Sequence, residues 1–163
     1  MRTLAVAMAI AIALPAAAAA QANFSGTWVF DPTRSQGVPD GVTITMIVKH
    51  DGDRVQIESQ ISAPMGQQTI PDLYVLDGKE TDYKPPVVGE GTGKGKRTAK
   101  WTADKNGFES SERATISAPE GAADITAKRK WTLAPDGKTL TIEMTLNSPQ
   151  GEQVSTRVFA KKS

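Results

Sequence analysis

The sequence contains no cysteine and only one histidine, His50. These two shortages exclude metal sites rich in sulfur or nitrogen ligands, and a Ser-His-Asp system would have to be built on His50 alone. His50 lies at the end of an expected strand, beside a turn, where it can anchor little. We therefore expect no catalytic residue, no metal and no cofactor, and a protein that is not an enzyme.

A surplus of positive charge is also absent. The chain has 19 Lys and Arg against 18 Asp and Glu, and removal of the leader described below takes away only Arg2, which leaves 18 of each sign. Nucleic-acid binders and polybasic membrane-surface proteins need an excess of lysine and arginine. The composition therefore excludes nucleic acid as a partner and argues against a polybasic membrane-surface protein.

Long apolar runs are missing as well, apart from a short one at the start. Leu4 to Leu14 is shorter than the roughly 18 residues of a spanning helix. It follows Arg2 and precedes a series of alanines, which is the pattern of an export signal cleaved after Ala20 or Ala22. We expect a signal peptide over 1–22 and a mature domain over 23–163. The mature protein would be a monomer, periplasmic or secreted, with no membrane insertion and no lipid-bearing cysteine.

What the chain does contain is a series of alternating polar and apolar runs, which predicts β-strands. Pairs typical of hairpin turns separate them: Asp51-Gly52, Asp77-Gly78, Asn106-Gly107, Asp136-Gly137 and, more weakly, Gln150-Gly151. No segment after the signal has a helical period. The pattern indicates an all-β, up-and-down antiparallel β-barrel of about eight to ten strands, closed or nearly closed.

Proline and glycine mark the expected irregular segments. Residues 31–41 predict a crossing loop with at most one helical turn near Asp31-Pro32. Pro71 places the start of the 69–75 strand at an edge or bulge. We expect loops over 84–96 and 117–122. The first flanks an opening in the barrel wall, and its glycines fail both phosphate-binding spacings.

Most charged side chains fall on outward faces, among them the carboxylates of Glu58, Asp72, Glu109 and Glu143. The exceptions are Arg129 and Arg157, a less certain Arg97, and Glu112, which share inward faces with apolar residues and therefore need partners. Two interpretations remain open. The arginines hold the anionic headgroup of a ligand, or Arg157 stacks on Trp28 and closes the base while Arg129 pairs with Glu112.

The first expected strand contains Gly26-Thr27-Trp28, and the last three contain Ala127-Lys128-Arg129-Lys130, Asp136-Gly137-Lys138-Thr139-Leu140-Thr141 and Ser155-Thr156-Arg157-Val158-Phe159-Ala160-Lys161. In these stretches the chain resembles lipocalins and fatty-acid-binding proteins. The resemblance implies that Arg129, Arg157 and Phe159 occupy the carboxylate-binding positions. Phenylalanine stands where that family has a tyrosine, and the family's helical lid has no counterpart here. The mature chain also looks like exported lipocalin-like domains of bacteria.

Together these observations give a candidate ligand-binding set and a structural barrel base, Gly26 and Trp28. The candidate ligand-binding residues are Arg129, Arg157, Phe159, Trp131, Trp101 and Glu112. The expected partner is a small apolar or amphipathic molecule, with an anionic one favoured by the arginines. The alternative is a filled barrel that serves as an envelope structural or interaction module without a ligand, because three tryptophans and several large aliphatic residues could pack the interior solid.

Overall fold

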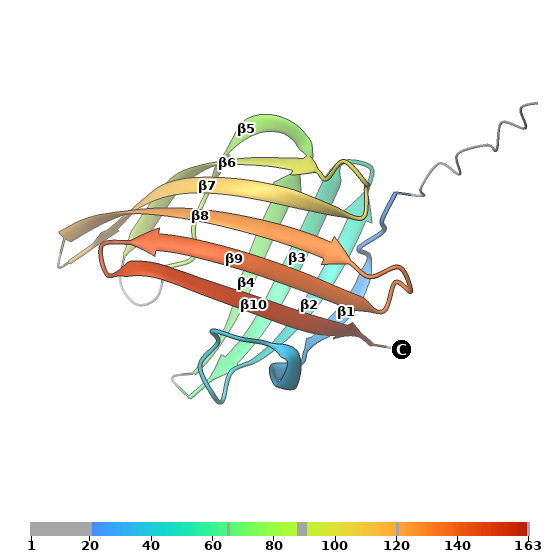
Figure 1. Ribbon diagram of the computed structural model, residues 1–163. Helices are drawn as coiled ribbons and strands as arrows, with labels where there is room; N and C mark the ends of the chain where they lie inside the picture. The colour runs from blue at the N-terminus through green and yellow to red at the C-terminus, as the bar shows by residue number, and fades with distance from the viewer. Residues whose placement is uncertain (1–20, 65, 88–90, 120, 163) are drawn as a thin grey trace, which may run out of the picture.

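The computed structural model describes residues 21–64, 66–87, 91–119 and 121–162, so nearly all of the expected leader lies outside the described residues. These residues form ten strands and one short 3₁₀ helix (Figure 1). The strands are β1 (Gly26–Phe30), β2 (Thr43–Asp51), β3 (Arg54–Ala63), β4 (Gly66–Val75), β5 (Asp77–Tyr83), β6 (Thr92–Trp101), β7 (Gly107–Ala118), β8 (Gly121–Leu133), β9 (Thr139–Ser148) and β10 (Gly151–Lys161), and the 3₁₀ helix η1 is Pro32–Arg34. In this part of the chain no helix is long and apolar enough to cross a membrane.

All ten strands lie in one antiparallel sheet in the order β4-β3-β2-β1-β10-β9-β8-β7-β6-β5. The first and last strands pair, with Phe30 opposite Phe159, and this pairing rolls the meander into a barrel. β4 and β5 stand at the two ends of the order and are not hydrogen-bonded neighbours. The predicted all-β, up-and-down antiparallel barrel is therefore confirmed, and it is nearly closed, with a gap between β4 and β5.

The predicted turns are partly right. Gly52 and Gly137 have positive φ angles of 57° and 67°, as tight hairpin turns require. Before β7 the left-handed residue is Lys105, at φ 58°, instead of Gly107. Asp77-Gly78 is not a hairpin turn between paired strands, because the strands on either side of it do not pair.

Some of the predictions from proline and glycine are likewise confirmed and others are wrong. Pro71 lies in β4, at an edge of the sheet as predicted, where its missing N–H breaks no ladder. The 31–41 segment contains the predicted helical turn, η1, and Gln36 in it forms an isolated bridge with Thr156 of β10. Two loop predictions are wrong in extent: Thr92 to Lys96 belong to β6, and Ala118 pairs with Gly121 at the tip of the β7–β8 hairpin. Glycines fit in β6 because neighbouring side chains occupy the space that a Cβ would need. The Tyr83 ring, for example, lies over Gly95.

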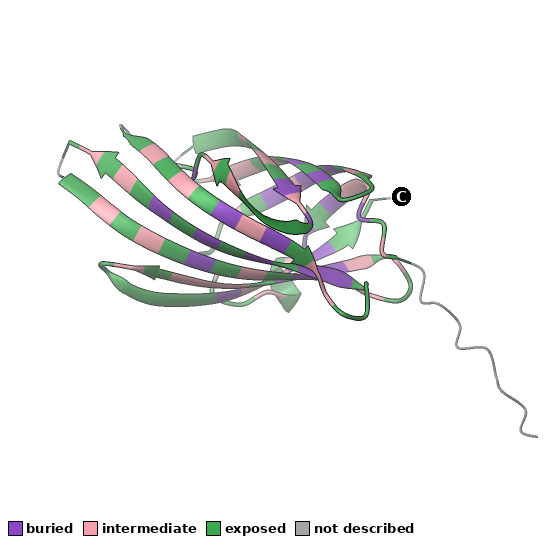
Figure 2. Cartoon of the chain, turned by 90° about the horizontal axis from the view of Figure 1, so that it is seen from above, coloured by how far each residue is buried: buried purple, intermediate pink, exposed green. Residues whose placement is uncertain are grey.

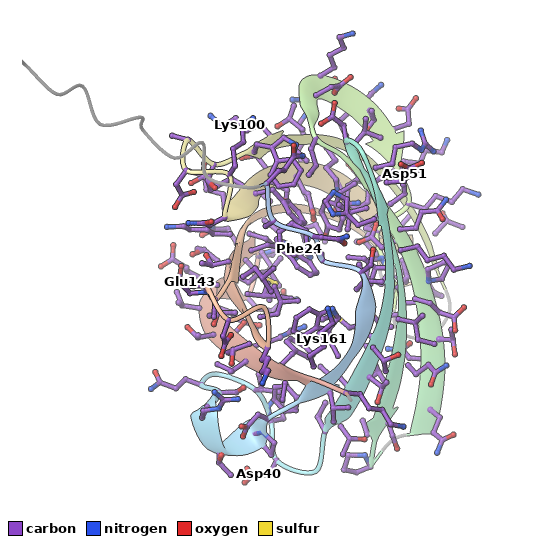
Figure 3. All side chains as sticks on the ribbon, turned by 90° about the vertical axis from the view of Figure 1, so that its right-hand side faces the viewer. Phe24, Asp40, Asp51, Lys100, Glu143 and Lys161 are labelled. Atoms are coloured by element: carbon purple, nitrogen blue, oxygen red, sulfur yellow. The ribbon has the colours of Figure 1, made fainter. Side chains whose placement is uncertain are left out.

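One end of the barrel is filled by aromatic side chains, and we call Phe24, Trp28, Trp101 and Phe108 the aromatic end. Phe24 lies within the ring of strands (Figure 3), edge-on to Phe108 at 5.3 Å between centroids. Trp28 is fully buried, and its Nε1 donates to the carbonyl of Phe24 over 2.8 Å. Along the strands, buried and exposed residues alternate (Figure 2), which is the predicted two-residue period.

The side chain that covers Trp28 corrects one interpretation made from the sequence. Trp28 is opposite Lys161 in the β1–β10 register, and the Lys161 Nζ lies 5.4 Å from the centre of the indole ring. Gly26 makes room for this lysine, since a Cβ there would be 2.7 Å from the Lys161 Cε. Arg157, four residues earlier, does not close the base, and its side chain remains inside the barrel.

Candidate ligand-binding site

An internal cavity of about 120 Å³ lies inside the barrel, and we call it the inner cavity. Its walls are mostly aliphatic and aromatic, and they come from β2, β3, β4, β8, β9 and β10 and from Pro86 between β5 and β6. The lining residues are Ile44, Met46, Ile57, Ser59, Ile61, Ile70, Asp72, Tyr74, Pro86, Arg129, Trp131, Ile142, Met144, Arg157 and Phe159. Four of the six candidate ligand-binding residues, Arg129, Trp131, Arg157 and Phe159, are among them.

Glu112, a fifth candidate, lies behind this wall and pairs with two arginines. Its side chain is 1% exposed and forms ion pairs with Arg129 and with Arg97, whose Nε donates over 3.0 Å. The Tyr83 hydroxyl also donates to this carboxylate over 3.3 Å. Burial acts against the charge of Arg129, but Tyr74 and Glu112 outweigh it and raise the pKa of the guanidinium. The pairing of Arg129 with Glu112 is the structural one of the two alternatives.

Arg97 is the most heavily bonded of the inward arginines, although it is absent from the candidate set. Its side chain is 2% exposed and lies between the rings of Tyr74 and Tyr83, with the guanidinium carbon 4.0 and 4.3 Å from their centres. The guanidinium reaches both oxygens of Asp72, over 2.5 and 3.1 Å, and the carbonyl of Leu73 over 2.9 Å. Arg97 lies two residues before the buried Ala99 in β6, so both share the inner face, and this spacing was the sequence signal for the burial of Arg97.

Asp72 corrects a second prediction, because its side chain faces inward. It precedes the buried Tyr74 by two residues in β4, so both share the inner face. The prediction had placed Asp72 outside because charged side chains are normally exposed. Here the carboxylate remains 29% exposed and is bonded to Arg97.

Arg157 differs from the other two inward arginines because none of the carboxylates of the described residues pairs with it. Its Nε is buried and has no hydrogen-bond partner in this part of the chain. Burial, and then the nearby charge of Arg129, lower the pKa of Arg157. The Nε1 of Trp131, on the same cavity, is a second buried donor without a partner. Arg129 Nη1 also makes no hydrogen bond, but it lies against the Glu112 carboxylate. Apart from it, the cavity wall carries two N–H groups that need an acceptor.

Trp101, the remaining candidate, and His50 are engaged at the aromatic end and do not line the inner cavity. The Trp101 Nε1 donates to Asp53 over 3.0 Å, and its ring stacks on Phe24 at 6.1 Å. His50 accepts the N–H of Phe24 at Nδ1 and lies 3.0 Å from the Gly52 carbonyl at Nε2. A histidine with its hydrogen on Nε2 satisfies both contacts, so both ring nitrogens hold the chain in place.

Comparison with known proteins gives a fold. No family model and no curated protein matches the sequence. The structure is similar to that of zebrafish ileal bile acid-binding protein complexed with cholic acid, at 19% identity and a TM-score of 0.53, over 85% of this chain and 98% of that one. The chain has a calycin-like fold. A secretory abundant heat-soluble protein from Ramazzottius varieornatus is also similar, at 15% identity and a TM-score of 0.46, over 85% and 94% of the two chains.

The calycin-like barrel, with its mostly apolar inner cavity, has a chemistry suited to binding. Three arginines and two carboxylates meet inside it, so one guanidinium charge is left over in the described interior. Apolar walls accept an apolar ligand body, and a buried guanidinium favours an anionic group on it. Apolar walls beside a guanidinium without a carboxylate partner in the described chain are chemically compatible with an amphipathic anion.

Proposed function

We propose that the protein is an exported, non-enzymatic calycin-like barrel that binds a small amphipathic anion in the inner cavity. Arg157 binds the anionic group, and the walls around Phe159 and Trp131 contact the apolar part. The observation that carries this proposal is the buried Arg157 Nε, which has no partner among the described residues. Export rests on the signal-like pattern of residues 1–22.

The Arg157 side chain, which has no carboxylate partner among the described residues, affects the free energy of the fold. A buried guanidinium N–H without an acceptor is destabilising, so a fold that keeps one, as Arg157 Nε, benefits when a ligand supplies the acceptor. A carboxylate offers two strong acceptor oxygens in a geometry that matches the guanidinium. Because Phe159 has no hydroxyl, Arg157 would bind the anion without help from that position. The zebrafish protein of similar structure is complexed with cholic acid, and an acidic ligand for the present barrel is compatible with that observation.

Cavity size limits the ligand and favours a second candidate function. A volume of about 120 Å³ corresponds to roughly four water molecules, whereas drug-sized ligands occupy about 300 to 1,000 Å³. The apolar part of a longer ligand must therefore extend out of the inner cavity or displace its walls. The second candidate is therefore a filled barrel that acts as an envelope interaction module and binds no small molecule.

Calorimetric titration with straight-chain carboxylates of increasing length, from butanoate to dodecanoate, tests the two candidates. Arg157→Gln should weaken carboxylate binding by about 1.5 to 3 kcal/mol, the range for a hydrogen bond to a charged group. Arg113→Gln is the matched control, because Arg113 is 67% exposed and pairs with Glu80 on the outer surface. Equal binding by the wild type and Arg157→Gln would refute the anion site.

Absence of binding by every carboxylate would favour the filled barrel instead. Native mass spectrometry of the protein purified from its own envelope would then show whether it retains a different small molecule. N-terminal sequencing of the same sample tests export. A mature chain that starts within a residue or two of Gln21 or Asn23 supports it, and an intact Met1 on a membrane-bound product contradicts it.

A further inference from the structure

The barrel wall is interrupted between β4 and β5, and one side chain spans the interruption. The two strands do not pair. Instead Arg97, on β6, extends to β4 and bonds the Asp72 carboxylate and the Leu73 carbonyl. We call the Arg97–Asp72 ion pair the latch. It replaces, with a side chain, the ladder that closes the rest of the barrel.

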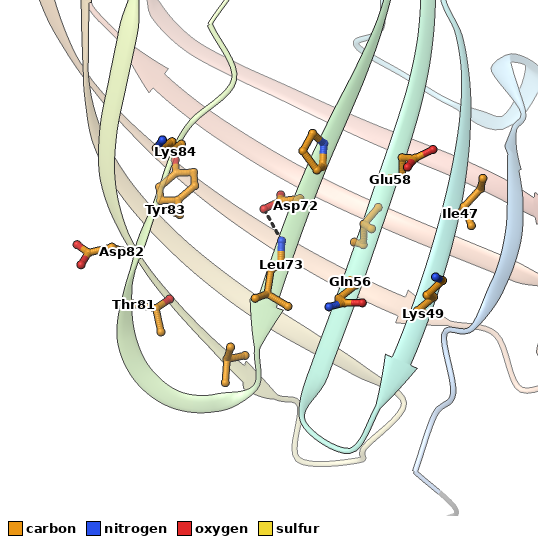
Figure 4. A pocket seen from close by; sticks show the side chains of 13 residues that line it. Ile47, Lys49, Gln56, Glu58, Asp72, Leu73, Thr81, Asp82, Tyr83 and Lys84 are labelled. Atoms are coloured by element: carbon orange, nitrogen blue, oxygen red, sulfur yellow. Dashed lines mark hydrogen bonds between the residues drawn. The ribbon is translucent and has the colours of Figure 1, made fainter.

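A groove of about 740 Å³ lies on the outer side of this interruption, and we call it the outer groove (Figure 4). Its walls come from the outward faces of β2, β3 and β4 on one side and from β5 on the other, and Figure 4 shows Leu73 and Asp82 on opposite sides. Ile57 and Asp72 line both the outer groove and the inner cavity. The latch therefore stands between the two spaces.

The two carboxylates that hold Arg97 are unequal in exposure, and this decides which bond opens. Glu112 is 1% exposed, whereas Asp72 is 29% exposed and in contact with water. The Asp72 pair is bidentate and shorter than the Glu112 pair, but solvent reaches it and screens it, so it is the pair that water can replace. Asp72 also accepts the N–H of Leu73 over 2.9 Å and would keep this bond when Arg97 leaves.

Addition of a further strand would be a different use of the same gap, but the edge of β4 does not favour it. Pro71 has no N–H to offer. The Leu73 N–H is bonded to Asp72 and the Leu73 carbonyl to Arg97. These bonds occupy the groups that a new strand would need, so the gap is better suited to passage than to pairing.

We propose that the ligand reaches the inner cavity sideways, from the outer groove through the β4–β5 gap, when the latch opens. This inference rests on the proposed function. β4 is a terminal strand of the sheet, paired on one side only, and such elements open at lower free energy than the core. Opening of the latch enlarges the route without loss of the aromatic end or of the Glu112 pairs.

A cross-link across the gap tests the route. The chain has no cysteine, so Leu73→Cys with Asp82→Cys gives two unique thiols on accessible positions, 37% exposed at Leu73 and 86% at the Asp82 side chain. A short bismaleimide joins them, and the same double variant capped with N-ethylmaleimide is the control. Decanoate binding is followed by stopped-flow tryptophan fluorescence, because Trp131 lines the inner cavity.

The cross-link should slow decanoate association and dissociation together, by about tenfold or more, with little change in Kd. Asp72→Asn should accelerate both rates, and Asp82→Asn, on the same groove but outside the latch, should change neither. An association rate that is equal in the cross-linked and capped proteins would overturn the proposal, as would an Asp72→Asn variant that keeps the wild-type rates.

A measurement without ligand separates this proposal from the proposed function. Spin labels on the cysteines at 73 and 82 report the width of the gap directly. The added Asp72→Asn change should broaden the distance distribution and extend it to longer values, and an unchanged distribution would refute the latch. If the gap opens in this way but the wild type binds no carboxylate, the proposed function fails and lateral admission fails with it.

Discussion

The aromatic end and the inner cavity are built by the same two-residue alternation, yet they differ in whether their polar groups are satisfied. At the aromatic end the Nε1 atoms of Trp28 and Trp101 both have acceptors. In the cavity the corresponding atom of Trp131 has none in the described chain, and neither has the Arg157 Nε. Packing and hydrogen bonding are both complete for the two tryptophans of the aromatic end, whereas two donors in the cavity lack acceptors in the described chain.

The largest expected effect concerns the aromatic end. Trp28→Ala should lower the free energy of unfolding by about 3 to 5 kcal/mol, because a fully buried indole is replaced by a void. Trp101→Ala should lower it less, since Trp101 is only half-buried. Denaturant unfolding of both variants measures the difference. A loss below about 1 kcal/mol for Trp28→Ala would contradict its role in closing the barrel.

Removal of the shared carboxylate should have the next largest effect. Glu112→Gln leaves Arg97 and Arg129 without their buried counter-charge and should cost about 3 kcal/mol of stability. The exposed Glu109→Gln is the control and should be nearly neutral. Thermal or denaturant unfolding decides. Equal stability of the two variants would mean that the buried ion pairs contribute nothing.

The two cavity arginines should respond in opposite ways. Arg129→Gln removes one of the two ion-pair partners of Glu112 and should cost about 1 to 3 kcal/mol of stability. Arg157→Gln removes a charge that has no partner in the described chain, so stability should be unchanged or should rise by about 1 kcal/mol or less. Melting curves in the absence of ligand test the contrast. Destabilisation by Arg157→Gln that matches that of Arg129→Gln would assign both residues a structural role.

A smaller effect should appear at alkaline pH. Burial, and then the charge of Glu112, raise the pKa of Tyr83 from 10.0 to about 12. Between pH 10 and pH 12 the unfolded chain has lost this proton and the folded protein keeps it, so stability falls as the pH rises. Below pH 10 the contribution is fully present. Tyr83→Phe should flatten this decline in melting curves across the range, and an unchanged slope would contradict the assignment.

How far the sequence predicts these two regions depends on the range of the interaction. Alternation is local, and it correctly indicated the strands and the inward positions of Arg97 and Glu112. The partner of Trp28 depends on the offset between β1 and β10, which neither strand encodes alone, so Arg157 was expected where Lys161 lies. The gap was invisible because Asp77-Gly78 carries the same signal as a true hairpin.

The most direct test of the account is an NMR measurement of the arginine Nε–Hε groups during a decanoate titration. The account predicts that the Arg157 signal shifts and exchanges more slowly with water as it gains a carboxylate acceptor. The Arg97 Nε, which already donates to Glu112, should keep its signal at saturation. An Arg157 signal that stays unchanged while decanoate is bound would contradict the central claim that this guanidinium is the anion site.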